Sequence, residues 1–481
     1  MSEGDASHAP KGRGGRLLRR TTGGLVLAVL VAAGAAYPLG LGERLGIATD
    51  PSPEASAPVV GLDLPTASPA AAVADVTDAL PADSAAVARA LRRLVQRDTL
   101  GGRVTVAVSE VGSSRTVYAV GPGIVTPAST LKLLTSTAAL AALGPDHRFS
   151  TTAVRTGREV VLVGGGDPLL ARVAGADTAY PRPADLTTLA RRTASALTEA
   201  GVSRVRLAYD TSLFEGPAIA PTWEPDYVAE NVVSPITSLW VDEGRERAGY
   251  SARSPDPAAA AAQFFAAALR KFGTTVQGQP VAKVAAGSAV QVASVEGAPL
   301  SQVVQHVLEL SDNEAAEVLA RHVAIARGRK ASFAGATTAV EEVLGELGVR
   351  LRGALLYDGS GLSRKDRLHY GTLLDVLRVA DTDEDLRTIL TGLPVAGFSG
   401  SLALRFETAP RVALGEVRAK TGTLTGVHGL AGTVRTRDGV LLAFVAIADR
   451  VRVFETLQAR ADLDEIAGAL AACRCRLGSG P

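Results

Sequence analysis

Strand-like patterns near the two ends of the folded region constrain this chain more than any other feature. Residues 103–120 (RVTVAVSEVGSSRTVYAV) alternate around a Gly-Ser turn, as two paired strands do. Residues 427–449 (VHGLAGTVRTRDGVLLAFVAIAD) do the same around Asp438-Gly439, a dipeptide favoured in hairpin turns. Mostly helical patterns lie between these regions, and a closing helix is marked by Leu463, Ile466 and Leu470. We therefore expect an α+β fold in which strands from both ends form one antiparallel sheet flanked by helices.

Two further patterns refine this organisation. A first helix is expected after Asp83, a candidate N-cap, with Val87, Leu91, Leu94 and Val95 on one face. Residues 150–295 have strand-like runs and a helical run of their own, without a sequence repeat. We expect this section to be an inserted domain.

The first 45 residues combine a basic flank with an apolar run. Five basic residues precede about twenty uncharged, mostly apolar residues, a pattern typical of an export signal or a membrane anchor. Small residues at 33–36 provide a candidate cleavage site, so both interpretations stay open. The basic flank favours the cytoplasmic side, which places the rest of the chain outside. Residues 46–83, rich in Pro, Ala and Ser, are expected to be a linker.

Composition excludes several classes of function. The formal net charge is +1, with 50 Lys+Arg against 49 Asp+Glu, so nothing indicates nucleic acid binding. The six histidines include no pair at ligand spacing, so no metal site is expected. Cys473 and Cys475 lie too close to the end of the chain to staple an exported fold and have no partners for a metal site, so we assign them no role.

Ser129 and Lys132 form an S-x-x-K pair within TPASTLKLLTS (residues 126–136). If Ser129 opens a helix, Lys132 lies one turn on and on the same face, where its amine can reach the hydroxyl. Lysine is rare in this chain, whose basic positions are mostly arginine, and only lysine can lose its proton to serve as a base. The alternative is a polar pair on a solvated helix surface.

Two more short motifs combine polar groups with a turn. Ser311-Asp312-Asn313 stands between two helical patterns, where a helix cap is the alternative interpretation. Lys420-Thr421-Gly422-Thr423 ends a strand-like run, where an ordinary edge strand is the alternative. Gly422 is expected to let the backbone of a ligand come close.

Together, S-x-x-K, S-D-N and K-T-G resemble the signature of penicillin-binding proteins and class A β-lactamases. With LVGGGDPLL (162–170), YDGSGLSR (357–364) and LPVAGFSGSLALRF (393–406), the chain resembles the peptidase S13 family of D-alanyl-D-alanine carboxypeptidases and endopeptidases. These are low-molecular-mass class C penicillin-binding proteins, and the resemblance extends from about residue 85 to 472. It implies a serine β-lactamase/D,D-peptidase-like transpeptidase fold, formed by residues 84–149 and 296–476 around the insertion at 150–295.

The resemblance also implies a role for each motif residue. Ser129 would be the nucleophile, Lys132 its base, and Ser311 the relay of a proton to the leaving group. Asn313 would hold the substrate amide, Lys420 and Thr421 would receive its terminal carboxylate, and the N–H groups of Ser129 and Thr423 would form the oxyanion hole. Lys132 must be neutral to act, and we expect burial and the nearby cation Lys420 to lower its pKa.

Asp226, with Trp223 and Tyr227, lies where the family receives the free amino end of the stem peptide. Packing and surface roles are the alternatives for these three residues. The implied partners are peptidoglycan stem peptides and β-lactam antibiotics, with no cofactor, and the membrane if the N-terminal segment is retained. The implied location is the cell-wall side, as an anchored or a secreted protein. The balance of carboxypeptidase and endopeptidase action stays open, as does a β-lactamase-like or esterase activity on the same scaffold.

Overall fold

The computed structural model describes residues 81–113, 115–176, 178–247, 249 and 251–478. They belong to one compact unit, residues 79–481. The expected signal or anchor segment (1–45) and the expected linker up to residue 80 lie outside the described residues. Among the helices that are described, none is both long and apolar enough to cross a bilayer.

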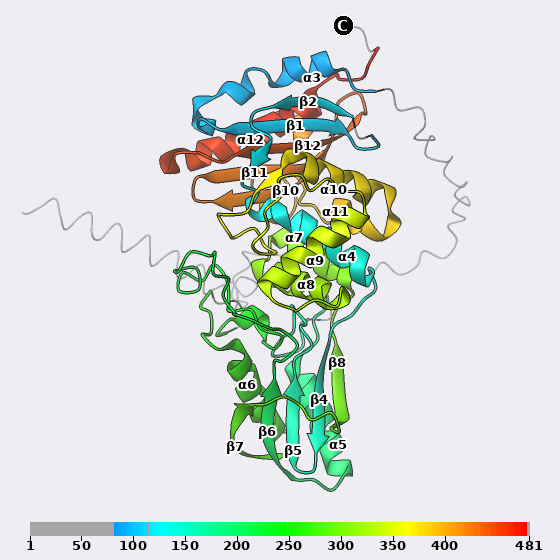
Figure 1. Cartoon of the computed structure of the whole chain (residues 1–481), viewed down its shortest axis with the longest axis vertical. Coiled ribbons are helices and arrows are strands. Elements are labelled where there is room, and N and C mark those ends of the chain that lie inside the picture. Colours follow the sequence, from blue (N-terminus) through cyan, green and yellow to red (C-terminus); the bar gives the residue numbers. More distant parts are fainter. Residues whose placement is uncertain (1–80, 114, 177, 248, 250, 479–481) are drawn as a thin grey trace, which may run out of the picture. The chain divides into compact units, whose positions relative to one another are not determined.

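A five-stranded antiparallel sheet joins strands from both ends of this unit, as expected from the sequence (Figure 1). Its order is β10-β11-β12-β1-β2, and Val104 of β1 pairs with Ala448 of β12. The hairpin between β11 and β12 turns at Asp438-Gly439, also as expected, and Gly439 takes a positive φ of 89° that suits glycine. The strands are β1 (Val104–Glu110), β2 (Thr116–Val120), β10 (Val417–Leu424), β11 (Val427–Arg435) and β12 (Leu441–Ala448).

Alternation along β12 gives the sheet two buried faces. Leu442, Phe444 and Ala446 pack with α3 (Ser84–Leu91) and α12 (Thr456–Ala472) in one cluster. The residues between them, such as Val445, face a second and larger helical cluster, because successive side chains of a strand point to opposite faces. That cluster is formed by α4 (Lys132–Leu143), α7 (Leu300–Leu310), α8 (Asn313–Ala326), α9 (Phe333–Glu346) and α10 (Tyr370–Thr382). Shorter elements complete this part: β3 (Ile124–Val125), β9 (Leu368–His369) and α11 (Thr388–Thr391).

The segments at residues 83–96 and 473–475, which flank the first sheet, differ from expectation in two details. Asp83 caps α3 as predicted, but the helix ends at Leu91, and Leu94 and Val95 reach the same cluster from a separate 3-10 turn. Cys473 and Cys475, to which no role was assigned, form a disulfide with each other.

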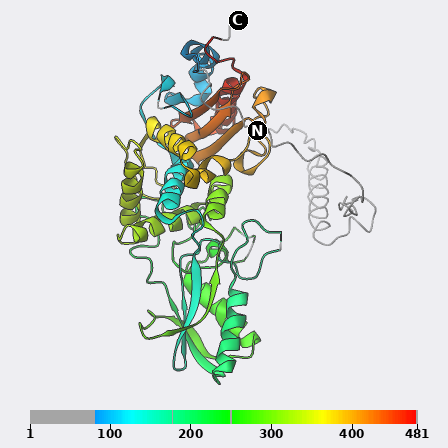
Figure 2. The ribbon, with the colours of Figure 1, turned by 90° about the vertical axis from the view of Figure 1, so that its right-hand side faces the viewer.

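A second five-stranded sheet lies at the other end of the unit, with helices of the larger cluster between the two sheets (Figures 1 and 2). Its order is β7-β6-β5-β4-β8, and it is mixed, because β6 pairs in parallel with both of its neighbours. A separate apolar cluster packs α5 (Leu186–Glu199) and α6 (Pro257–Lys271) against this sheet. The strands are β4 (Ser150–Thr156), β5 (Glu159–Val163), β6 (Arg204–Asp210), β7 (Thr275–Ala282) and β8 (Val290–Glu296).

Residues 211–241, between β6 and α6, return to the helices of the first part. Trp223 and Trp240 are buried in a fourth cluster that includes Val318 of α8 and Phe333 of α9. The same cluster contains Ala128, next to Ser129, and Leu424, at the end of β10. This long segment therefore packs directly on the elements that carry the three motifs.

Replacing Phe444, which is fully buried between the first sheet and α12, tests this packing. Phe444→Ala should lower the free energy of unfolding by about 3–5 kcal/mol, because lost burial and a residual cavity add. Phe454→Ala is the matched control, since that ring is 81% exposed, and it should change stability by less than about 0.5 kcal/mol. Chemical denaturation of residues 80–481, which contain all four apolar clusters, measures both changes. Equal losses in the two variants would contradict the assignment of this core.

Candidate active site

The turn that carries Ser129 brings its hydroxyl to the amine of Lys132. A 3-10 turn (Ala128–Leu131) runs directly into α4, which begins at Lys132. Lys132 Nζ lies 2.9 Å from Ser129 Oγ, so the two side chains lie on the same side of the helix start, as expected. Lys132 is fully buried and Ser129 is half-buried. The arrangement therefore differs from a polar pair on a solvated surface.

Lys132 Nζ is surrounded by three hydrogen-bond partners. Besides Ser129 Oγ, it lies 2.8 Å from Asn313 Oδ1 and 2.8 Å from the carbonyl oxygen of Ser360. The orientation of the Asn313 amide is fixed, because its Nδ2 donates to the carbonyl of Val232 at 3.1 Å. Asn313 Oδ1 and the Ser360 carbonyl can only accept, so they take two N–H groups of Lys132. A neutral Lys132 then has its lone pair free to accept the hydroxyl proton of Ser129.

Burial lowers the pKa of Lys132 to about 8, although nearby carboxylates, Asp358 and Glu317 first among them, act in the opposite direction. Burial was expected to lower this pKa and does so. The charge of Lys420 was expected to contribute, but it is not among the causes of the shift. Burial and the charge of Lys132 instead lower the pKa of Lys420 well below its ordinary value. Two buried amines this close disfavour each other's protonation, and the effect falls on Lys420.

Ser311 and Asn313 are held at a tight junction between α7 and α8. Ser311 takes a left-handed conformation (φ 62°), which breaks the helix and turns the chain. Asp312 is a helix cap, because its Oδ1 accepts from the N–H of Ala315 at 2.9 Å. Capping and function thus fall on different residues of this motif, and its two outer residues face the lysines.

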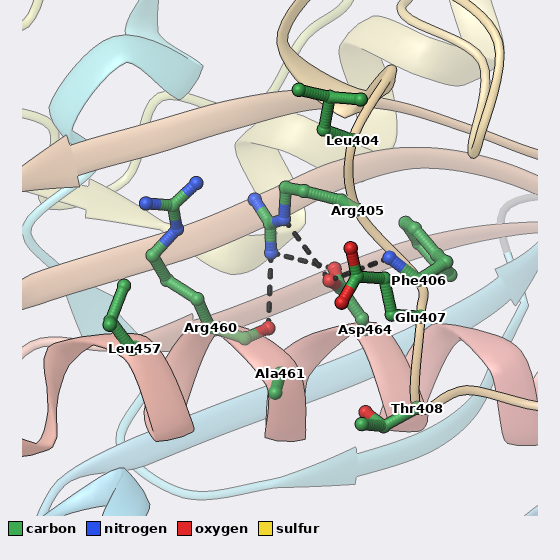
Figure 3. A pocket seen from close by; sticks show the side chains of 9 residues that line it. All are labelled: Leu404, Arg405, Phe406, Glu407, Thr408, Leu457, Arg460, Ala461 and Asp464. Carbon is green, nitrogen blue, oxygen red and sulfur yellow. Dashed lines mark hydrogen bonds and ion pairs between the residues drawn. The ribbon is translucent and has the colours of Figure 1, made fainter. Parts of the chain in front are cut away.

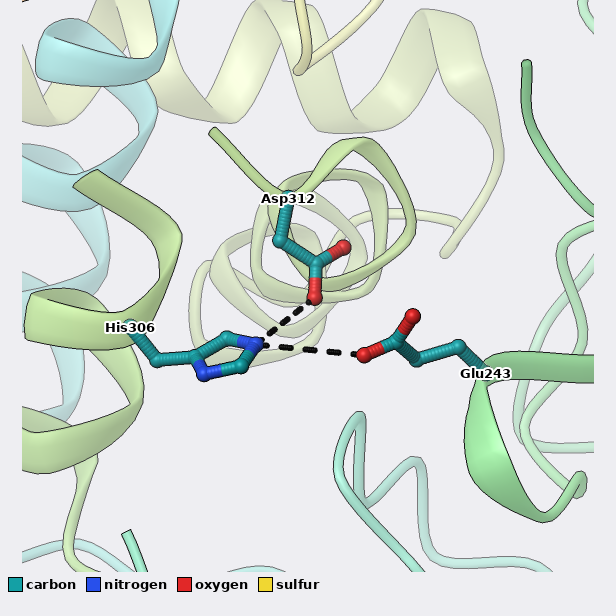
Figure 4. A group of neighbouring side chains, drawn as sticks. All are labelled: Glu243, His306 and Asp312. Atoms are coloured by element: carbon teal, nitrogen blue, oxygen red, sulfur yellow. Dashed lines mark hydrogen bonds and ion pairs between the residues drawn. The ribbon is translucent and has the colours of Figure 1, made fainter. Parts of the chain in front are cut away.

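His306 fixes Asp312 from the last turns of α7 (Figure 4). Its Nε2 lies 3.1 Å from Asp312 Oδ2 and 3.8 Å from Glu243 Oε1. Burial lowers the pKa of His306, but hydrogen bonds to both carboxylates outweigh it and raise that pKa to about 10. We therefore interpret the group as an ion pair that links residues 242–244 to the Ser311–Asn313 junction.

Lys420 and Thr421 lie on β10, facing the Ser311–Asn313 junction. Lys420 Nζ donates to Ser311 Oγ at 2.8 Å and to the carbonyl of Thr421 at 3.0 Å. Thr421 Oγ1 donates to Ser401 Oγ at 2.9 Å, and Thr423 is exposed two residues further on. The sequence analysis missed Ser401 as a partner of this motif, although its segment, LPVAGFSGSLALRF, contributed to the resemblance.

Gly422 packs closely against the turn that carries Ser129, a contact that was not expected from the sequence. A Cβ atom at this position would lie 2.8 Å from the carbonyl oxygen of Pro127 and 3.4 Å from Cβ of Ala128. The missing side chain therefore makes room for the turn that carries Ser129. This close approach lets β10 and the serine turn line the same site.

The loop at residues 358–363 supplies the carbonyl that binds Lys132. Asp358 accepts from the N–H groups of Gly361 and Ser363, at 2.7 and 2.6 Å. Gly361 has a φ of 83°, and a Cβ there would lie 1.9 Å from the carbonyl oxygen of Ala128. This segment, YDGSGLSR, contributed to the resemblance, but the contact between Ser360 and Lys132 was not expected from the sequence.

Trp223, Asp226 and Tyr227 separate into a buried and a surface part. The indole N–H of Trp223 donates to Asp358 Oδ2 at 2.7 Å, in the interior. Asp226 is exposed, and its carboxylate makes no hydrogen bond or ion pair within the described residues. Tyr227 is half-buried, and its pKa is raised by burial and by Glu224. Arg364 lies close to both Glu224 and the carbonyl of Thr425, at the end of β10. Asp226 therefore lies on the exposed surface of the 211–241 segment, which we call the rim, and not in the buried group around Lys132.

A separate cavity of about 240 Å³ lies beside α12 (Figure 3). Arg405 Nη2 pairs there with Asp464 Oδ1 at 2.6 Å, and the aliphatic side chains of Leu404 and Leu457 lie near its mouth. Its nine lining residues include none from the three motifs. This cavity is distinct from the site around Ser129.

The close packing at Gly422 predicts the effect of a single methyl group. Gly422→Ala should fold but react with a penicillin at least about tenfold more slowly, because its Cβ pushes the Ser129 turn away from β10. Gly345→Ala on α9 is the control, since a Cβ there meets nothing within 4 Å, and it should react as the parent does. Acylation rates with a fluorescent penicillin measure both variants, and an unchanged rate in Gly422→Ala would contradict the proposed contact.

Comparison with known proteins places this geometry in a family. The model of the D-Ala-D-Ala carboxypeptidase 3 (S13) family matches residues 87–249 and 245–470. Carboxypeptidase DacB of Mycolicibacterium smegmatis is 35% identical over 474 residues, covering 95% of this chain and 98% of the relative. A D-alanyl-D-alanine carboxypeptidase of an Actinomadura species is 28% identical over 473 residues, covering 80% and 84%.

A solved structure confirms the expected fold class. The crystal structure of penicillin-binding protein 4 (DacB) from Haemophilus influenzae superposes with a TM-score of 0.64, at 22% identity. It covers 78% of this chain and 98% of its own. The sheets and flanking helices described above are therefore those of the penicillin-binding fold with its extra domain. The chain belongs to the D-Ala-D-Ala carboxypeptidase 3 (S13) family and is a peptidase of that family.

Proposed function

We propose that the chain is a serine-type D,D-peptidase that cleaves D-Ala-D-Ala in peptidoglycan stem peptides through an acyl-enzyme on Ser129. The observation that supports this most directly is the buried amine of Lys132, 2.9 Å from Ser129 Oγ, with its other contacts on two obligate acceptors. Such a pair is an activated nucleophile with its base. Penicillins, which resemble the substrate, would acylate the same hydroxyl and block it.

In acylation, Ser129 Oγ attacks the carbonyl carbon of the scissile amide while its proton moves to Lys132 Nζ. The N–H groups of Ser129 and Thr423 then stabilise the negative charge on the carbonyl oxygen. The leaving D-alanine nitrogen takes a proton from Ser311 Oγ, which Lys420 holds at 2.8 Å. Ser311 would regain its proton from Lys132, which is then neutral again, so that Ser311 relays the proton of Ser129 to the leaving group. A water molecule later hydrolyses the ester, its hydroxide adding to the acyl carbon and its proton returning to Ser129 Oγ.

The substrate would be held by groups on both sides of Ser129. Asn313 can donate or accept a hydrogen bond with the substrate amide from the start of α8. Lys420 and Thr421 provide an amine and a hydroxyl for the terminal carboxylate, and Thr423 is exposed next to them on β10. The pairing of Thr421 with Ser401 adds a second hydroxyl at this end of the site.

Asp226 would bind the free amino end of the stem peptide, from the rim formed by residues 211–241. Its exposed carboxylate makes no hydrogen bond or ion pair within the described residues, so it can meet an ammonium group. The same rim could admit a cross-linked peptide, so we include cleavage of D-Ala-diamino acid cross-links in the proposed activity.

The organisation that we propose follows the two sheets. Residues 84–149 and 296–476 would form the peptidase domain, and residues 150–295 the inserted domain, with its segment 211–241 completing the site. The N-terminal pattern supports a location outside the cytoplasm, on the cell-wall side. Residues 1–45 would either keep the protein on the membrane or be removed to release it.

Ser129→Ala tests the nucleophile. The parent protein, residues 80–481, should gain the mass of one penicillin molecule. The Ser129→Ala variant of the same protein should gain none, because the attacking oxygen is missing. Ser136→Ala is the control, since this buried serine lies on the same helix, one turn beyond Lys132, and should still be acylated. Intact-protein mass spectrometry measures the adduct, and equal labelling of the Ser129 variant would rule out the proposal.

Asp226→Ala tests the rim. It should leave penicillin acylation within about twofold but lower kcat/KM on peptides with a free diamino-acid end by about tenfold, because a remote contact helps only substrates that reach it. Glu230→Ala, an exposed carboxylate of the same segment, should change neither activity. The assay compares product release from such peptides and from the same peptides with that amine acetylated. A parallel fall of both activities would contradict a role in specificity.

A further inference from the structure

The same face of α8 contacts Lys132 directly and through a loop. Asn313 opens the helix and touches the amine with its Oδ1, and Glu317 follows exactly one turn later on that face. Glu317 is only 1% exposed. Its Oε1 accepts from the N–H groups of Gly359 and Ser360, at 3.0 and 2.8 Å, and the carbonyl of Ser360 in turn accepts from Lys132 at 2.8 Å.

Asp358 holds the other side of the same loop. Its carboxylate accepts from Gly361 and Ser363 within the loop and from the indole of Trp223, as described above. The two carboxylates thus fix the peptide groups on either side of Ser360. A shift of this loop would move the Ser360 carbonyl away from the amine and release one of the two N–H groups that orient the lone pair of Lys132.

The charges around Lys132 distinguish these two carboxylates from their neighbours. Four carboxylates act on Lys132 through their charge, those of Asp358, Glu317, Asp312 and Glu314. Asp312 is paired with His306, and Glu314 with Arg253 at 2.8 Å. Within the described residues, the hydrogen-bond donors to Glu317 and Asp358 are neutral N–H and O–H groups. Burial and the charge of Asp358 raise the pKa of Glu317 to about 8, so Glu317 is ionised mainly in the upper part of the neutral to alkaline range.

Arg321 and Asp366 lie close to this pair, and within the described residues neither neutralises it by an ion pair. The charge of Arg321 acts on Glu317, but its terminal N–H groups donate to the carbonyls of Glu215, Pro217 and Ala331. Asp366, next to Asp358, has a pKa raised well above its ordinary value by burial and by the charge of Asp358, so it adds a neutral carboxyl. On the far side, the charge of Lys132 lowers the pKa of Lys420.

We propose that Glu317 and Asp358 are positioning residues for Lys132. They hold the Ser360 carbonyl against its amine, and the charge of Asp358, joined by that of Glu317 when Glu317 is ionised, stabilises the ammonium formed when Lys132 takes the proton of Ser129. This inference rests on the proposed role of Lys132 as the base. Glu317 and Asp358 lie outside the three motifs. In this inference they help to determine how readily Lys132 accepts a proton.

The test is the pH dependence of acylation by a fluorescent penicillin, measured on residues 80–481 between about pH 6 and pH 10. The rate should rise as Lys132 loses its proton, with a midpoint near its pKa of about 8. Glu317→Gln and Asp358→Asn each remove a negative charge that raises this pKa, so each midpoint should move to lower pH, by at least about half a unit. The plateau rate should also fall about tenfold or more, because the ammonium is less stabilised.

Two further variants separate charge from shape. Glu317→Asp keeps the charge but is too short to reach both N–H groups, so its plateau should fall while its midpoint stays. Glu346→Gln removes an exposed charge on α9, with a side chain 59% exposed, and should change neither quantity. Circular dichroism checks that each variant is folded, and if Glu317→Gln does not fold, Asp358→Asn decides.

The outcomes separate this inference from the proposed function. A reactive parent protein with unmoved midpoints in the folded Glu317→Gln and Asp358→Asn variants would overturn the positioning role while leaving the serine peptidase intact. A midpoint that moves to higher pH would overturn it equally. A parent protein that forms no penicillin adduct would refute the proposed function, and this inference with it.

Discussion

The structure of this site depends on the burial of one amine. Lys132 has no exposed surface, yet its Nζ is in contact with groups from the serine turn, the start of α8 and the loop around Ser360. Burying an unpaired ammonium is costly, and this cost is what lowers the pKa of Lys132. The contacts that make burial tolerable also orient the amine. Removal of any one of these elements would therefore affect both the charge and the direction of the base.

The long segment at residues 211–241 belongs to this arrangement as much as the motifs do. The carbonyl of Val232 fixes the amide of Asn313, and Trp223 binds Asp358. The N–H of Ser234 donates to Glu314 at 3.1 Å, next to the Ser311–Asn313 junction. A segment that the sequence places in an insertion thus supplies backbone and side-chain contacts to the site. Changes to it can therefore alter the geometry around Lys132.

Much of the fold and the site could be predicted because the signals are local. The hairpin at Asp438-Gly439, the cap at Asp83 and the helix break at Ser311 all depend on near neighbours in the chain. The missed features depend on distant ones. The close packing at Gly422 depends on Pro127, which is far away in the sequence. The contact of Ser360 with Lys132 uses its backbone carbonyl, a group that every residue has and that no sequence pattern can reveal. The pairing of Ser401 with Thr421 likewise joins segments that only the folded chain brings together.

The pairing of β1 with β12 has a consequence for how this protein is made. Val104 and Ala448 are neighbours in the middle of the sheet but belong to opposite ends of the polypeptide. A ribosome completes β1 long before it completes β12, so the nascent chain cannot close this sheet until almost every residue has been synthesised. Contacts of such high sequence separation also form slowly, because loop closure precedes any gain from pairing. The reactive site is therefore assembled last, since β10, with Lys420, docks on the same late strands.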